Sequence, residues 1–170
     1  YPSFLSVFLR KMPKAPLKLY REKTRLGLLH PDPEQERAVM ALDALYQELM
    51  VAHFRKKSLW QTIRGLGRDQ QDYTKGVYMH GGVGRGKSML MDLFFESLPG
   101  EIKKRRVHFH AFMVEVHDYF HSRREDDDFS EGVDGLIPSL ASLIQSRSKV
   151  LCFDEFHITD VADAMILGRL

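Results

Sequence analysis

A glycine-rich loop at residues 81–88 constrains this chain more than any other feature of its sequence. A β-prone run at 76–80 precedes the loop, and a helical pattern over 88–95 follows it. The loop matches the pattern G-x-x-x-x-G-K-[ST] at every fixed position, and strand, loop and helix form the context that the pattern requires. We therefore predict a phosphate-binding loop made of Gly81, Gly82, Val83, Gly84, Arg85, Gly86, Lys87 and Ser88.

The residue types in this loop suit a polyphosphate ligand. Glycines permit backbone torsions that other residues avoid, so successive N–H groups can turn inward at the positive end of the following helix. Lys87 is expected to lie against the β- and γ-phosphates, and the Ser88 hydroxyl to complete the coordination of a magnesium ion. The predicted cofactors are a nucleoside triphosphate and Mg²⁺.

An acidic pair, Asp154 and Glu155, directly follows the apolar run 149–153, which is typical of a buried parallel strand. Ligands of open α/β sheets bind at the carboxyl ends of the strands, so we expect this pair beside the phosphate loop. Asp154 is predicted to bind Mg²⁺, and Glu155 to polarise the attacking water. The predicted catalytic residues are therefore Glu155 and Lys87.

The hydrophobic periodicity predicts an α/β fold with a parallel sheet, flanking helices and the order βαβαβ. An aspartate cap and a first-turn proline mark the start of the first helix at residue 32. A weak helix and a connector are expected over 53–75, and an acidic loop over 122–128. The other predicted helices are 32–51, 112–120, 137–144 and a last one from 162, and the other strands are 106–110 and 149–153.

The acidic pair also narrows the class of enzyme. Small GTPases place a glycine-containing motif after this aspartate and read guanine with Asn-Lys-x-Asp, and neither occurs in the chain. Nucleotide kinases share the loop, but the adjacent glutamate suits hydrolysis better than transfer to a metabolite. ATP hydrolysis is therefore the predicted activity.

Composition places further limits on function. The 25 basic and 23 acidic side chains nearly cancel, and the formal charge of +2 provides no field that would demand nucleic acid or anionic lipid. The single cysteine, Cys152, lies in an apolar run, which predicts a buried thiol and a reducing compartment. No stretch approaches the roughly 20 apolar residues needed to span a bilayer.

Several runs of sequence together resemble the ZapE-type cell-division ATPases. They are residues 76–88, 91–94, 107–113, 151–156, 159–160 and 163–167. The resemblance implies an AAA+ ATPase that associates in bacteria with the division machinery through the tubulin-like protein FtsZ, and mitochondrial relatives that serve protein quality control. It also implies a cytoplasmic location, or a peripheral one at the inner membrane, mitochondrial in a eukaryote.

Length is where the chain departs from that family. Such ATPases continue beyond a segment like this one into further strands, a polar sensor residue, an arginine finger and a helical lid. We therefore expect an extension over 1–30 and an incomplete ATPase domain over 31–170, whose first strand lacks its flanking partners. The resemblance also implies ATP-dependent homo-oligomerisation of the full-length protein.

Two other functions and one other site stay open. The basic run 103–106 would serve DNA binding in a helicase-loader ATPase, although a solvated strand entry is the better interpretation. A nucleotide-gated adaptor would bind ATP without turnover. His117 and His121, four apart on one helix, have the spacing of a metal pair, but no third ligand accompanies them.

Overall fold

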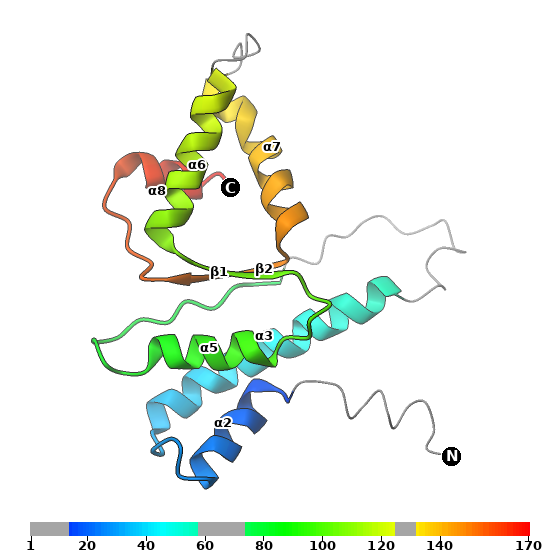
Figure 1. Ribbon diagram of the computed structural model, residues 1–170, viewed down its shortest axis with the longest axis vertical. Coiled ribbons are helices and arrows are strands. Elements are labelled where there is room, and N and C mark those ends of the chain that lie inside the picture. Colours follow the sequence, from blue (N-terminus) through cyan, green and yellow to red (C-terminus); the bar gives the residue numbers. More distant parts are fainter. Residues whose placement is uncertain (1–13, 58–73, 125–131) are drawn as a thin grey trace. The chain divides into compact units, whose positions relative to one another are not determined.

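The computed structural model describes residues 14–57, 74–124 and 132–170 (Figure 1). These residues fall into two compact units, 1–100 and 101–170. Both contain the helices expected of an α/β protein, and the second contains a small parallel sheet. The predicted α/β class with a parallel sheet and flanking helices is confirmed. Among the described residues, no helix is both long and apolar enough to cross a membrane.

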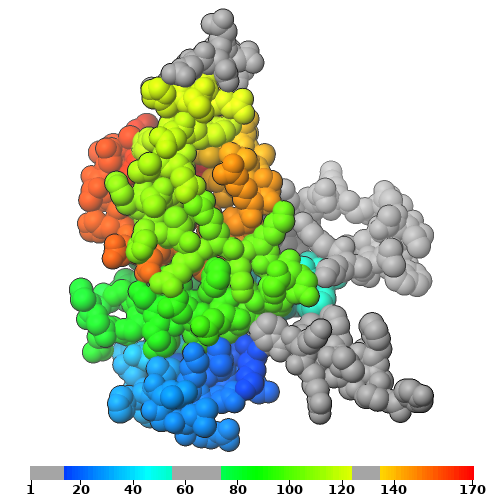
Figure 2. Space-filling model, in the orientation of Figure 1, coloured from blue at the N-terminus to red at the C-terminus, as the bar shows by residue number. Residues whose placement is uncertain are grey.

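Three helices pack against one another in the first unit: α2 (Pro16–Arg25), α3 (Pro33–Lys57) and α5 (Lys87–Ser97). The start of α3 is where the sequence predicts it, because the Asp32 carboxylate accepts the N–H of Glu34 at 2.8 Å. The sequence pattern does not predict α2, which lies within the expected extension. Its Tyr20 is buried, and in Figure 2 the blue and light-blue atoms of α2 and early α3 form one continuous surface.

The segment 76–80 is not a strand, so the prediction of βαβαβ is wrong at its first element. A strand requires backbone hydrogen bonds to a neighbour, and the two strands in the described part of the chain pair only with each other. The segment still leads into the glycine loop, and α5 follows that loop as predicted.

The second unit contains β1 (Lys104–His108), α6 (Phe109–Arg124), α7 (Gly132–Arg147), β2 (Val150–Asp154) and α8 (Val161–Leu167). The strands are parallel, with His108 opposite Asp154. Figure 1 shows α6, α7 and α8 on the same side of the two strands. The core of this unit consists of Phe109, Phe112, Met113, Val116, Phe120, Ile137, Leu140 and Ile166.

The second predicted strand ends two residues early, because helical spacing takes over at Phe109. Residues 109, 112, 113, 116 and 120 follow a helical stripe, and all five side chains are buried. His110, which falls within the predicted strand 106–110, therefore lies on α6. The other helices and β2 are confirmed, Cys152 is buried as predicted, and residues 58–73 and 125–128 lie outside the described residues.

Candidate nucleotide-binding site

The glycine loop bends through backbone conformations that favour glycine. Gly84 has φ +77°, and Gly86, the residue that precedes α5, has φ +83°. A side chain at either position would be strained, because L-residues seldom adopt the left-handed region. The loop therefore reaches the N-terminus of α5 through two turns that favour glycine, and that N-terminus carries a partial positive charge.

Lys87 holds the two arms of this loop together. Its Nζ donates to the carbonyl oxygens of Gly81 and Gly82, each at 2.8 Å. The Lys87 side chain is half-buried, while the side chains of Val83, Arg85 and Ser88 are exposed. An ammonium group at the mouth of an exposed, glycine-rich loop is arranged to attract an anionic ligand.

The acidic pair ends β2 in the second unit. Asp154 is the last residue of the strand, and its Oδ2 accepts from Arg106 Nη2 at 2.6 Å. Glu155 follows in a left-handed conformation with φ +52°, which is uncommon for a residue with a side chain and concentrates at functional sites. Its carboxylate is 83% exposed and lies 3.9 Å from His108 Nδ1. Glu155 is therefore open to water.

Strand β1 provides a basic partner for each of the two carboxylates, which the sequence patterns do not reveal. Arg106 and His108 are neighbours on one face of β1, opposite Cys152 and Asp154 in the parallel register, and their side chains approach Asp154 and Glu155. Their spacing of two within a predicted strand could have indicated that both side chains lie on the same face. Which residue each side chain would meet depended on the register.

The loop belongs to the first unit and the acidic pair to the second, so their union in one site stays a prediction. The donor chemistry fits magnesium, because the Ser88 hydroxyl and the Asp154 carboxylate are oxygen ligands of the kind that this hard cation takes. Among the described residues, no group of three or more His, Cys, Asp and Glu could hold another kind of metal ion.

Internal partners occupy the side chains of the basic run 103–106. Lys103 donates to the Ser146 carbonyl at 3.0 Å, and Arg105 and Arg106 form ion pairs with Glu115 and Asp154. A surface that binds nucleic acid needs cations that are free to meet phosphates. These internal contacts are what the strand-entry interpretation of the run predicts.

The histidines singled out by spacing also have a local explanation. His117 Nε2 lies 2.7 Å from Asp163 Oδ1, which connects α6 to the first turn of α8. His121 is exposed on the next turn of α6. This contact between helices accounts for His117 without a metal.

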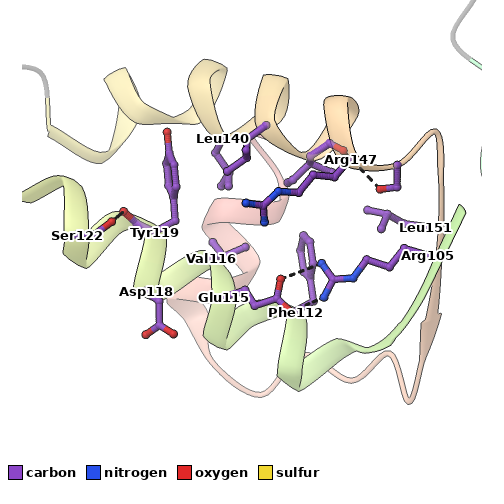
Figure 3. Close-up of a pocket in the computed structure, with 13 residues that line it drawn as sticks. Arg105, Phe112, Glu115, Val116, Asp118, Tyr119, Ser122, Leu140, Arg147 and Leu151 are labelled. Atoms are coloured by element: carbon purple, nitrogen blue, oxygen red, sulfur yellow. Dashed lines mark hydrogen bonds and ion pairs between the residues drawn. The ribbon is translucent and has the colours of Figure 1, made fainter. Parts of the chain in front are cut away.

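A cavity of about 550 Å³ lies between α6 and α7 (Figure 3). Its walls combine apolar and polar side chains, and Arg105 and Arg147 lie at one end, where Arg105 forms a bidentate pair with Glu115. None of the predicted site residues is among the described residues that line it.

The Arg105–Glu115 pair predicts a small, pH-dependent contribution to stability. The hydrogen bond from Arg105, with its charge and that of Arg147, holds the pKa of Glu115 below its ordinary 4.5. A carboxyl group with a lowered pKa stabilises the fold above that ordinary pKa, and this stabilisation disappears as the pH falls through the folded-state value. Since both side chains are over a third exposed, we expect less than about 1 kcal/mol.

The measurement is the free energy of unfolding of the wild type and Glu115→Gln across acidic pH. The difference between them should be present at neutral pH and should vanish well below pH 4.5. Glu101→Gln, at an exposed position in the same unit, is the matched control and should show no such difference. A difference that is independent of pH would contradict the prediction.

A glycine loop closed by lysine at the start of a helix, with an acidic pair after a parallel strand, defines the class of P-loop nucleoside triphosphatases. The family described as "AFG1-like ATPase" matches residues 14–170. The chain belongs to the AFG1-like ATPase family, and the resemblance to ZapE-type ATPases is confirmed.

Individual relatives agree with this assignment. The chain is 39% identical over 162 residues to "Cell division protein ZapE" of Escherichia coli strain K12, covering 91% of this chain and 41% of that protein. It is 40% identical over 121 residues to "Lactation elevated protein 1 homolog B" of Danio rerio, covering 65% and 24%. The chain thus spans less than half the length of these relatives. No solved structure matches it.

Proposed function

We propose that the protein of which this chain is a part binds and hydrolyses ATP and couples hydrolysis to the remodelling of a partner protein. The observation that carries the proposal is the glycine loop, in which Lys87 closes a left-handed turn at the start of α5. Family membership and the acidic end of β2 support it. The adjacent pair of carboxylates favours hydrolysis over transfer to a second substrate.

In the proposed reaction the loop holds the phosphates and Glu155 activates water. The N–H groups at the start of α5 and the Lys87 ammonium bind the β- and γ-phosphates and offset their charge. Magnesium, when bound through Ser88 and Asp154, neutralises phosphate charge as the bond breaks. Glu155 takes a proton from water while the water oxygen attacks the γ-phosphorus. The bond to the bridging oxygen breaks, releasing ADP and phosphate.

The proposed partner is FtsZ or another division protein. The E. coli relative is named a cell division protein, and residues 76–88 and 151–156 carry the resemblance to its family. The proposed location is the cytoplasm, or the inner membrane as a peripheral protein. We further propose that the full-length protein forms homo-oligomers when ATP is bound, because ring-forming ATPases complete the active site with an arginine from a neighbouring subunit.

ATP turnover by the full-length protein, with and without FtsZ filaments, tests the partner. A changed rate on addition of FtsZ is expected, and an unchanged rate would contradict that choice. Stimulation by single-stranded DNA would favour the helicase-loader alternative, against which the internal partners of Arg105 and Arg106 argue. ATP binding without turnover would identify a nucleotide-gated adaptor.

A further inference from the structure

We propose that Gln35 is a positioning residue that holds the phosphate loop in its binding conformation. Its side-chain Nε2 donates to the carbonyl oxygen of Arg85 at 3.3 Å, across 50 residues of sequence. Both residues belong to the first unit. The inference rests on the proposed function, since it assigns a role toward the same phosphate loop.

Because the peptide bond is planar, the contact with the Arg85 carbonyl also sets the direction of the Gly86 N–H. In a trans peptide, the carbonyl of one residue and the N–H of the next point in opposite directions. A donor that fixes the Arg85 carbonyl from the side of α3 therefore turns the Gly86 N–H away from α3. The Gly86 N–H is one of the groups at the start of α5 that a phosphate would meet. Gln35 thus orients an N–H that it does not itself touch.

Gln35 also lies close to the backbone of residue 86, where the positive φ already favours glycine. A Cβ at Gly86 would lie 3.0 Å from Gln35 Nε2, in addition to the strain of φ +83°. Lys87 holds the carbonyls of Gly81 and Gly82 at the other end of the loop. Gln35 and Lys87 together therefore fix carbonyl groups on both arms of the loop.

Gln35 is itself held in place at the start of α3. Its backbone N–H donates to Asp32 Oδ1 at 3.4 Å, and Asp32 contacts the Tyr20 hydroxyl through its backbone, also at 3.4 Å. Tyr20 belongs to α2, and its side chain is buried. The backbone that carries Gln35 is therefore anchored to a packed part of the unit, and its half-buried side chain extends from there to the loop.

The test compares Gln35→Ala, Gln35→Glu and the control Gln47→Ala in the full-length protein, with ATP affinity, KM, kcat and Tm as readouts. Gln47 is an exposed glutamine on the same helix. Losing one hydrogen bond should weaken ATP binding about three- to tenfold in Gln35→Ala. Gln35→Glu should lose more than tenfold, because it sets a carboxylate oxygen against a carbonyl oxygen. We expect KM to rise with kcat unchanged, as for uniform binding.

The relative ATP affinities of Gln35→Ala and Gln35→Glu distinguish a positioning role from a packing role. Glutamate has the shape of glutamine, so if Gln35 only filled space, Gln35→Glu would be closer to the wild type than Gln35→Ala, which would overturn the inference. Wild-type affinity in both variants would also overturn it, while loss of binding in Lys87→Ala would leave the proposed function standing. Intact ATP binding by Lys87→Ala would overturn the proposed function and this inference together.

Discussion

Replacing Lys87 with alanine is expected to reduce ATP affinity of the full-length protein by about 10² to 10⁴-fold. In the proposed complex the ammonium group contacts two phosphates, and each hydrogen bond to a charged group contributes about 1.5–3 kcal/mol. Each 1.4 kcal/mol corresponds to a factor of about ten in affinity. Isothermal titration with ATP would measure the loss directly, and turnover should disappear with binding.

The control for this variant is Lys75→Ala. Lys75 is an exposed lysine in the same unit, upstream of the loop. Its loss changes the net charge by the same amount and should leave ATP affinity unchanged. The Tm of Lys87→Ala should stay near the wild-type value, because the loop that it bridges lies at the surface. An ATP affinity equal to that of Lys75→Ala would show that the glycine loop does not bind the nucleotide.

Replacing Glu155 with glutamine is expected to lower kcat by about 10² to 10⁴-fold, the range that a positioned general base contributes. Glutamine keeps the shape of the side chain and cannot accept the proton from water. ATP affinity should change little, because the proposed role of Glu155 lies in the chemical step. The variant should therefore accumulate with ATP bound, which single-turnover kinetics would detect.

Two comparisons identify the role of Glu155 more sharply. Glu101→Gln removes an exposed carboxylate from the same unit and should retain full turnover. Asp154→Asn should instead raise the Mg²⁺ concentration needed for nucleotide binding, because Asp154 is the proposed metal ligand. If Glu155→Gln retained wild-type turnover, the water-activating residue would have to be sought elsewhere in the full-length protein.

Most helices and the last strand could be predicted because their signals are local. The Asp32 cap starts α3, the Gly86–Lys87 junction starts α5, and an apolar run forms β2. The secondary-structure predictions are wrong where local signals compete or where an element needs a partner that is distant in sequence. Residues 76–80 have strand-like composition, but the described part of the chain offers them no pairing strand. The helical stripe from Phe109 ends the predicted strand at His108, so that Phe109 and His110 are helical.

Sequence alone determined which residues are candidates for chemistry, because a phosphate loop and an acidic strand end each consist of consecutive residues. Only the tertiary structure decided which side chains accompany them. Gln35 meets Arg85 across 50 residues, and Arg106 meets Asp154 across 48. Such contacts depend on helix packing and on the register of parallel strands, which spacing along the chain does not encode.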